Sequence, residues 1–138
     1  MDYKKLFPIF ETHKELAYLD SAATNQKPEK VIKAIDEYNR KFNASPNRGS
    51  YGISVEATCQ YNQAKGKVAK FIGAKNTEII FVKSSTEGLN LLANSFSYEL
   101  TKEDNILVGI TSHQSNIVPW QEVRSRTGAE IRYIYLDK

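Results

Sequence analysis

The chain has 138 residues, of which 41% are hydrophobic and 25% are charged, a balance that is typical of a globular protein and unlike that of a disordered chain. The net charge of +3 comes from 19 basic and 16 acidic residues scattered along the sequence, so no basic stripe indicates a nucleic-acid partner. No apolar run approaches the roughly 20 residues of a membrane span, no secretory signal is recognisable, and a single cysteine allows no internal disulfide, absences that favour a cytoplasmic location.

The first segment of the chain is predicted to contain little regular structure. Residues 1–17 should form a short helical or irregular arm. Residues 16–19 are a short apolar run that we predict to be a strand. Residues 20–28 are small and polar and end in proline, which is typical of a loop.

Two amphipathic helices are predicted between this loop and residue 73. The first begins at about Pro28, and its apolar residues recur at spacings of three and four, which places them on one face. The second follows a loop over residues 43–52, with Ser54 as its expected N-cap and Gly73 as its expected left-handed cap. The apolar faces consist of Val31, Ile35, Tyr38 and Phe42 in the first helix, and of Ala57, Tyr61, Ala64, Val68 and Phe71 in the second.

The remainder of the chain alternates between predicted strands and helices. Residues 79–82 and 106–110 are continuous apolar runs, typical of strands covered on both faces, and residues 131–136 alternate as a third strand. A helix is predicted in each interval, the second with Pro119 in its first turn and Gly128 just past its end. This order implies βαβ crossovers and a parallel βαβαβ sheet, which is an α/β fold.

The sequence ends where the third predicted strand ends, without a helix to cover that strand. Three strands also make a small sheet for a fold of this class. We therefore expect the 138 residues to be an incomplete, N-terminal part of a larger domain.

A polar turn, Lys-Ser-Ser-Thr-Glu-Gly at residues 83–88, follows the first predicted strand and opens a helix. Ligands of open α/β sheets bind beyond the carboxyl ends of the strands, where a helix N-terminus offers free N–H groups to a phosphate. The hydroxyls of Ser85 and Thr86 add two donors. A second interpretation needs no ligand, because Ser84 and Glu87 fit a capping box.

A second polar loop, residues 111–116, follows the second predicted strand and should lie at the same edge of the sheet. His113 in this loop could stack on a flat cofactor ring or exchange protons near neutral pH, although taken alone it is better explained as a capping or packing residue. Ser115 or Asn116 is expected to cap the next helix, and Trp120 to pack in the core. No Cys/His spacing predicts a metal site.

Four motifs occur in one order along the chain. They are Tyr-Leu-Asp-Ser-Ala-Ala-Thr at 18–24, Asn-Arg-Gly at 47–49, Ser-Thr-Glu-Gly-Leu-Asn at 85–90, and His113 followed by Asn-Ile-Val-Pro-Trp-Gln at 116–121. Together they resemble the motifs of the Suf-type (NifS-like group II) cysteine desulfurases of the class V aminotransferase family. The resemblance implies the large domain of a pyridoxal-phosphate (PLP) enzyme of fold type I over residues 18–138, preceded by the arm of residues 1–17.

The resemblance also implies which residues contact the cofactor, pyridoxal 5'-phosphate. Ser85 and Thr86 match the pair that holds the PLP phosphate. His113 matches the histidine that stacks on the PLP ring and assists proton transfer, which makes it the candidate catalytic residue.

On the substrate side, the resemblance assigns roles to three further residues. Ala23 and Thr24 fall in the loop that lines the substrate entrance of the family. Arg48 matches an arginine that reaches toward the active site of the partner subunit, since these enzymes are homodimers. The sequence departs from the family near this side at Asn47, Tyr51, Ser112 and Gln114.

The activity implied by the resemblance is the conversion of L-cysteine to L-alanine and enzyme-bound persulfide sulfur, which a sulfur-acceptor protein would take up. The family's PLP-binding lysine, its ring-nitrogen aspartate and its sulfur-receiving cysteine all lie further along the chain than residue 138. We interpret Lys83 as a solvated lysine at a strand end and Cys59 as a small packing residue. The chain alone is therefore expected to be inactive.

Three other hypotheses remain open from the sequence. The parent protein could be a selenocysteine lyase or another class V lyase or aminotransferase. The chain could be an inactive fragment or a non-enzymatic interaction module. A nucleotide-binding α/β domain would use the same geometry at the ends of its strands.

Overall fold

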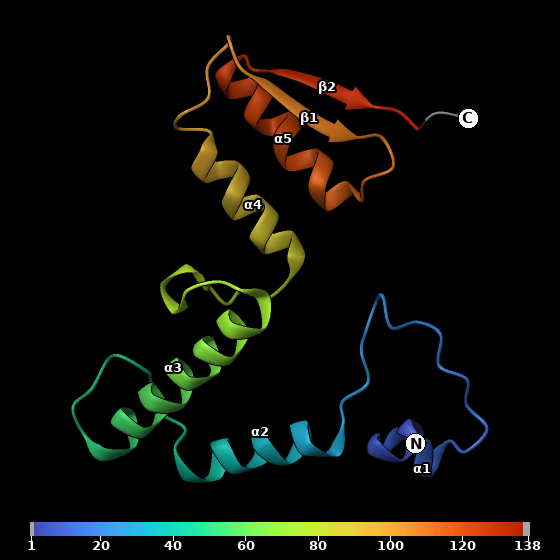
Figure 1. Ribbon diagram of the computed structural model, residues 1–138, viewed down its shortest axis with the longest axis vertical. Helices are drawn as coiled ribbons and strands as arrows, with labels where there is room; N and C mark the ends of the chain where they lie inside the picture. Colours follow the sequence, from blue (N-terminus) through green and yellow to red (C-terminus); the bar gives the residue numbers. More distant parts are fainter. Residues whose placement is uncertain (1, 137–138) are drawn as a thin grey trace. The chain divides into compact units, whose positions relative to one another are not determined.

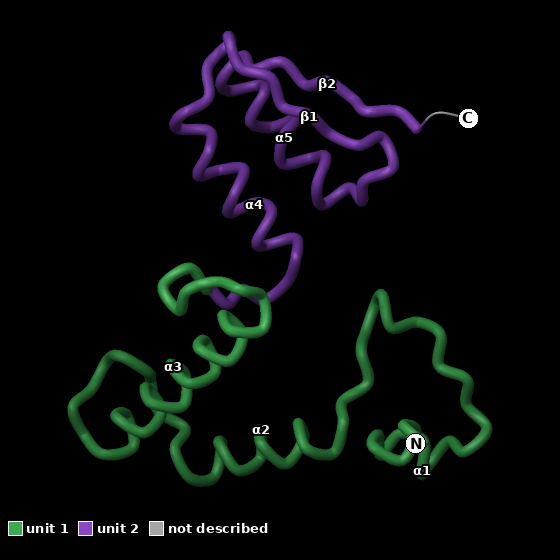
Figure 2. The backbone as a smooth tube through the Cα atoms, viewed as in Figure 1, with its two compact units in different colours: residues 1–79 green, residues 80–138 purple. Residues whose placement is uncertain are grey.

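The computed structural model describes residues 2–136. It divides into two compact units, unit 1 up to Ile79 and unit 2 from Ile80 (Figure 2). The predicted boundary between an arm of residues 1–17 and a domain of residues 18–138 stays a prediction. Residues 1, 137 and 138 of these two ranges lie outside the described residues.

Unit 1 consists of helices and loops (Figure 1). Its elements are η1 (Tyr3–Leu6), α1 (Ile9–Thr12), α2 (Glu29–Lys41), α3 (Gly52–Ile72) and η2 (Asn76–Glu78). The two short helices confirm the helical or irregular arm. The predicted strand at residues 16–19 is wrong, because this segment pairs with no strand and the Tyr18 hydroxyl instead donates to the carbonyl oxygens of Asp20 and Thr24.

Helix α2 begins directly after Pro28, as its sequence predicts. Three ion pairs one turn apart lie along its polar face, between Glu29 and Lys33, Asp36 and Arg40, and Glu37 and Lys41. Each such pair stabilises an exposed helix by about 0.2–0.5 kcal/mol. Within the described residues Val31, Ile32 and Ile35 remain exposed, whereas Tyr38 is half-buried and packs against Phe42.

Helix α3 begins at Gly52 with Tyr51 as N-cap, so the prediction of Ser54 as N-cap is wrong. Ser54 lies in the first turn and is fully buried, and its Oγ donates to the carbonyl oxygen of Ser45 at 2.9 Å. A buried hydroxyl needs such a partner, and here the partner comes from the preceding loop. The left-handed cap at Gly73 is confirmed, with φ of 73°.

Unit 2 contains α4 (Ser85–Phe96), β1 (Asn105–Gly109), α5 (Gln114–Thr127) and β2 (Glu130–Ile134). The two strands are parallel, which confirms the α/β class with a parallel sheet and α5 as the crossover helix. The predicted strand at residues 79–82 is wrong. A strand needs a neighbouring strand for its ladder of backbone hydrogen bonds, and within residues 2–136 the sheet consists of β1 and β2 without this segment.

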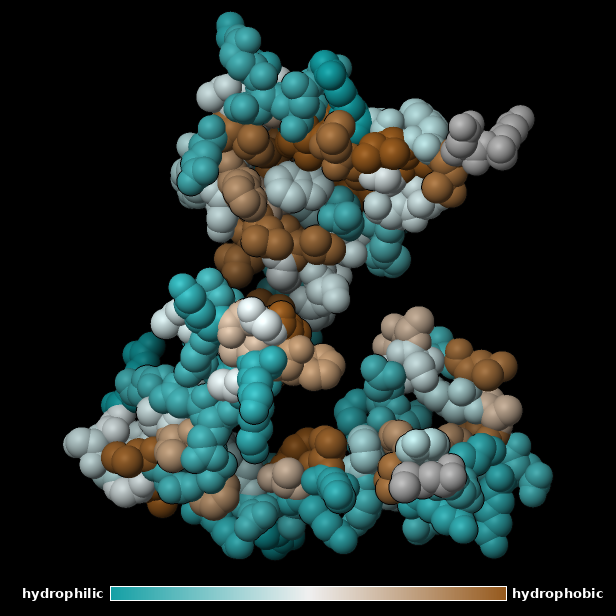
Figure 3. All heavy atoms as spheres, in the orientation of Figure 1, coloured by the Kyte–Doolittle hydropathy of each residue, from teal (hydrophilic) through white to brown (hydrophobic). Residues whose placement is uncertain are grey.

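The core of unit 2 lies between the sheet and its two helices. Its buried members are Ala93, Ile106, Val108, Val123 and Ala129, with Leu100, Ile117, Trp120, Ile131 and Tyr133 packed around them. Alternate residues of β1 and β2 supply the sheet side of this core, because successive side chains of a strand point to opposite faces. The other face carries Leu107, 65% exposed, and Ile134, and Figure 3 shows apolar side chains at the surface of unit 2.

Helix α5 begins at Gln114, so the prediction that Pro119 lies in the first turn is wrong. Pro119 is buried in the helix interior, where it removes one hydrogen bond of the i to i−4 ladder. The prediction of Ser115 or Asn116 as N-cap is also wrong, because His113 occupies that position. The left-handed cap at Gly128 is confirmed, with φ of 78°, and so is the packing role of Trp120.

Truncation of Val123 tests the core of unit 2. Val123 is 0% exposed, so Val123→Ala should lower the free energy of unfolding by about 2 kcal/mol through lost burial and the cavity left behind. The matched control is Val118→Ala in the same helix, since Val118 is 56% exposed and its truncation should change stability by less than about 0.5 kcal/mol. Urea unfolding followed by the fluorescence of Trp120, the single tryptophan, measures both; equal losses would contradict the assigned core.

A turn before β1 makes stability depend on pH. The backbone N–H and the hydroxyl of Thr101 donate to Asp104 at 2.7 and 2.9 Å, and they lower the pKa of that carboxyl below its ordinary 3.8. A lowered pKa gives stability that is present above pH 3.8 and is lost as the pH falls through the lower, folded-state pKa.

Asp104→Asn should therefore be less stable than the native protein at pH 7, and the difference should shrink as the pH falls below about 4. Urea unfolding at a series of pH values measures this difference. Glu103→Gln serves as the control, because the Glu103 carboxylate only approaches Lys102 at 3.9 Å. If the free energies of unfolding of Asp104→Asn and the native protein differ by the same amount at every pH, the Thr101 contacts are not the cause of the difference.

Candidate functional site

The first turn of α4 is closed by Ser84 and Glu87, the two residues of the predicted capping box, although the reciprocal contact of Glu87 falls on Lys83, one residue before the N-cap. Ser84 is the N-cap, and its Oγ accepts from the backbone N–H of Glu87 at 3.2 Å. The Glu87 carboxylate accepts in turn from the backbone N–H of Lys83 at 2.5 Å. The box thus satisfies the backbone donors of Lys83 and Glu87 and fixes where the helix begins.

The capping box leaves the donors of Ser85 and Thr86 available. Their backbone N–H groups have no intrahelical acceptor, because the helix begins at Ser85. Both side chains are exposed, and within residues 2–136 neither hydroxyl has a hydrogen-bond partner. Two N–H groups and two exposed hydroxyls therefore lie in the first turn, at the positive end of the helix dipole, which favours an anion.

His113 is the N-cap of α5, the position that Ser84 occupies in α4. Its Nδ1 accepts from the backbone N–H of Ser115 at 3.2 Å and lies 2.9 Å from the Ser115 hydroxyl. The imidazole is exposed. His113 therefore caps the helix through one ring nitrogen and keeps its ring faces accessible.

The two helices run in the same direction, side by side (Figure 1). The guanidinium of Arg126 near the end of α5 donates to Asn94 near the end of α4 at 3.4 Å. A shallow hollow between the helices is lined by Asn90, Ala93, Asn94, Pro119, Glu122 and Arg126. Because the helices run in the same direction and Arg126 contacts Asn94 near their ends, the first turns of α4 and α5 lie at the opposite end of this contact, at one end of unit 2.

This end of unit 2 has the donor chemistry that PLP requires. The free donors of Ser85 and Thr86 suit a phosphate, and the accessible ring of His113 suits a flat aromatic partner. The structure thus brings the predicted cofactor residues to the same end of one unit. Their contact with a cofactor stays a prediction.

The predicted substrate-side residues lie in unit 1. The backbone N–H groups of Ala23 and Thr24 both donate to the carbonyl oxygen of Asp20, at 3.2 and 3.1 Å, which closes the loop into a turn. Arg48 is exposed and follows Asn47, whose φ of 60° places it in the left-handed region. Asparagine tolerates this conformation better than most residues.

Two hydroxyl residues support these loops in ways that the sequence did not predict, since Thr58 was given no role and Ser115 was expected to be an N-cap. Thr58 Oγ1 donates to the carbonyl oxygen of Ser54 at 2.7 Å and accepts from the backbone N–H of Asn47 at 2.9 Å, which fixes the residue before Arg48. Ser115 holds His113. The signal in both cases is a hydroxyl residue at short helical spacing from a loop, a pattern too frequent in proteins to identify a site by itself.

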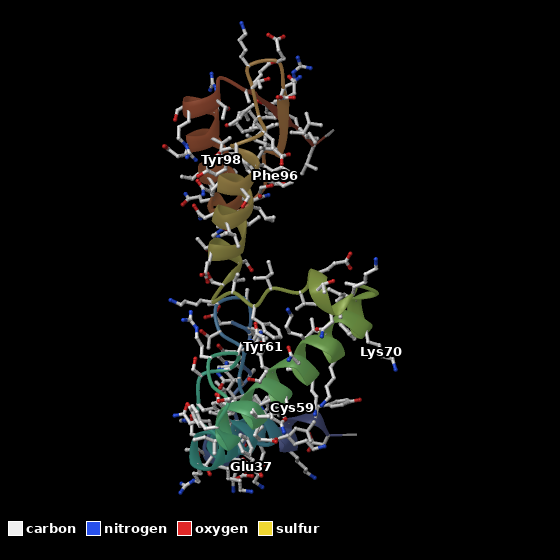
Figure 4. The ribbon with its side chains drawn as sticks, turned by 90° about the vertical axis from the view of Figure 1, so that its left-hand side faces the viewer. Glu37, Cys59, Tyr61, Lys70, Phe96 and Tyr98 are labelled. Atoms are coloured by element: carbon white, nitrogen blue, oxygen red, sulfur yellow. The ribbon has the colours of Figure 1, made fainter. Side chains whose placement is uncertain are left out.

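The predicted packing role of Cys59 is wrong, because this cysteine is exposed on α3 (Figure 4). The buried positions of α3 are Ser54, Ala57 and Ala69, and Cys59 lies off the face that they define. Its sulfur accepts from Gln63 Nε2 at 3.2 Å. Lys83 is exposed, as predicted, although the segment before it is not a strand.

Two further features concern only the part of the chain that the structure describes. There, no group of three or more His, Cys, Asp or Glu side chains could hold a metal ion. None of the helices there combines the length and apolar character that crossing a membrane demands.

Residues 17–138 match the aminotransferase class-V family. A probable cysteine desulfurase of Halalkalibacterium halodurans is 42% identical over 99% of this chain and 35% of its own length. A probable cysteine desulfurase of Vibrio cholerae is 48% identical over 84% of this chain and 29% of its own length.

Solved structures agree with these sequence relatives. The apo cysteine desulfurase of Thermococcus onnurineus is 35% identical, with a TM-score of 0.90 over 99% of this chain and 33% of its own. The cysteine desulfurase CsdA of Escherichia coli is 30% identical, with a TM-score of 0.80 over 98% of this chain and 34% of its own. The chain therefore spans about a third of the length of the proteins that it matches.

Replacing serines of the polar turn separates its capping function from its free donors. Ser84→Ala should lower the free energy of unfolding by about 1 kcal/mol, because the Glu87 N–H loses its acceptor. Ser85→Ala is the matched control, since its exposed hydroxyl has no partner and its loss should cost less than about 0.5 kcal/mol. Urea unfolding measures both, and a larger loss for Ser85→Ala would show that the donor assignment is reversed.

Proposed function

The chain belongs to the class V aminotransferase family, and from this premise we propose that the protein is a PLP-dependent cysteine desulfurase that converts L-cysteine to L-alanine and enzyme-bound persulfide sulfur. The observation that carries the proposal is the set of unpaired donors of Ser85 and Thr86 at the same end of unit 2 as the imidazole of His113. The names of the relatives support the same reaction.

In this proposal the first turn of α4 holds the PLP phosphate. The backbone N–H groups and hydroxyls of Ser85 and Thr86 donate to the phosphate oxygens, and the dipole of the helix favours the negative charge. The Glu87 carboxylate accepts from the Lys83 N–H, so it does not occupy the N–H groups or the hydroxyls of Ser85 and Thr86. PLP, when bound, supplies an electron sink for the amino-acid substrate.

His113 covers one face of the cofactor ring in this arrangement and assists the transfer of protons. Its capping contact with Ser115 sets the position of the ring, and its exposure leaves a face free for stacking. The imidazole is suited to this role because one of its ring nitrogens can donate a proton while the other accepts one.

The substrate side is proposed to involve unit 1. Ala23 and Thr24 line the substrate entrance, and Arg48 reaches toward the active site of a partner subunit in a homodimer. Arg48 suits a carboxylate substrate, since its guanidinium can donate two parallel hydrogen bonds. We further place the protein in the Suf-type (NifS-like group II) subgroup, in the cytoplasm, with a sulfur-acceptor protein as partner.

The test uses the full-length protein and two variants. Ser85→Ala combined with Thr86→Ala removes both hydroxyl donors and should weaken PLP binding at least tenfold, because hydrogen bonds to a charged group are worth about 1.5–3 kcal/mol each. Ser95→Ala at the far end of α4 is the control, since the Ser95 hydroxyl donates only to the Leu91 carbonyl. Titration of PLP absorbance measures the affinity.

The same preparations are then supplied with L-cysteine or L-selenocysteine and a thiol reductant, which releases the bound sulfur or selenium as sulfide or selenide, and alanine and the released product are measured. The native protein and Ser95→Ala should form alanine from cysteine, and the double variant should need more PLP to do so. If alanine forms from selenocysteine but not from cysteine, the protein is a selenocysteine lyase instead. Binding of a nucleotide in preference to PLP would contradict the proposal altogether.

A further inference from the structure

We propose that Ser115 is a positioning residue that holds the neutral His113 imidazole in the tautomer with its proton on Nε2. The inference deepens the proposed function and rests on it for its chemical meaning. Its structural basis, the two contacts between Ser115 and Nδ1, lies entirely within the first turn of α5.

The backbone contact determines which ring nitrogen carries the proton. The Ser115 N–H can only donate, and it points at Nδ1 of His113 at 3.2 Å. In a neutral imidazole the nitrogen that accepts a hydrogen bond has no proton, so the proton must be on the other nitrogen. A proton on Nδ1 would set two donors against each other at this distance.

The helix makes this backbone donor a fixed one. Ser115 is the second residue of α5, and N–H groups of the first turn have no intrahelical acceptor. An N-cap side chain normally supplies the acceptor through an oxygen atom, whereas here an imidazole nitrogen takes that place. Without this contact the Ser115 N–H would have no acceptor. The tautomer of His113 is therefore coupled to the capping of the first turn of α5.

The Ser115 hydroxyl adds a second contact at the same nitrogen. Its Oγ lies 2.9 Å from Nδ1, and a hydroxyl can rotate to donate there as well. Two donors from one residue hold Nδ1 from two directions, so they limit rotation of the ring as well as its tautomer. Nε2 then carries an N–H on the side of the ring away from Ser115, where it can donate to an acceptor on a bound ligand.

The experiment measures the ring nitrogens directly by ¹⁵N NMR of the full-length protein without PLP, labelled in histidine. The chain described here has two histidines, His13 and His113, and His13 is exposed and serves as an internal reference. Above the pH at which the rings are neutral, the two ring nitrogens of His113 should differ more in chemical shift than those of His13. A large difference indicates a single tautomer, and the proton is on Nε2 if the shift of the protonated nitrogen belongs to Nε2 and that of the unprotonated nitrogen to Nδ1.

Two variants separate positioning from general structural effects. Ser115→Ala keeps the backbone donor but removes the hydroxyl, and should move the His113 shifts part of the way toward the averaged values of His13. Ser115→Thr restores a hydroxyl and should restore the native shifts. Far-UV circular dichroism checks that α5 is intact in both variants.

Several outcomes would overturn the proposal. The native protein could show His113 with its proton on Nδ1, or ring-nitrogen shifts that are averaged between tautomers like those of His13. The Ser115→Ala spectrum could also be identical to the native one. PLP is absent from the NMR measurement. A result that contradicts the tautomer proposal therefore does not by itself contradict the proposed desulfurase function. A protein with the single tautomer that makes no alanine from cysteine would refute the desulfurase proposal and leave the role of Ser115 standing.

Discussion

The candidate site depends on the close packing of α4 against α5. Ala93 of α4 and Val123 of α5 belong to one buried cluster, and Pro119 lies in the same contact. The small side chain of Ala93 allows the helices to approach, and their common direction then determines where both first turns lie. The free donors of α4 and the imidazole of α5 meet at one end of unit 2 only because this apolar contact aligns the two helices.

Local signals in the sequence predicted where helices end better than where strands form. Gly73 and Gly128 both adopt the left-handed conformation expected of them, because a residue with positive φ favours glycine whatever surrounds it. The segment 79–82 has the composition of a buried strand, but a strand exists only with a neighbour to pair with. Ser54 was misread for a similar reason, since its partner is the Ser45 carbonyl nine residues earlier.

The sequence predicted which residues of the polar turn to consider, but it did not predict which of them cap the helix and which keep free donors. Capping and ligand binding are alternatives at the level of the sequence, whereas the structure assigns them to different groups in the same turn. Ser84 and Glu87 form the cap, and the donors of Ser85 and Thr86 stay unpaired. This division does not follow from residue types, because it depends on where α4 begins, whereas the capping role of His113 was one of the interpretations that its sequence favoured.

The exposure of Cys59 has a consequence for spectroscopy. Cys59 is the only thiol in the 138 residues and lies in unit 1, whereas the only indole, Trp120, lies in unit 2. A maleimide dye attached to the accessible sulfur would therefore form a donor–acceptor pair with the native indole across the two units. Resonance energy transfer within that pair reports the separation of the units without the introduction of any new residue.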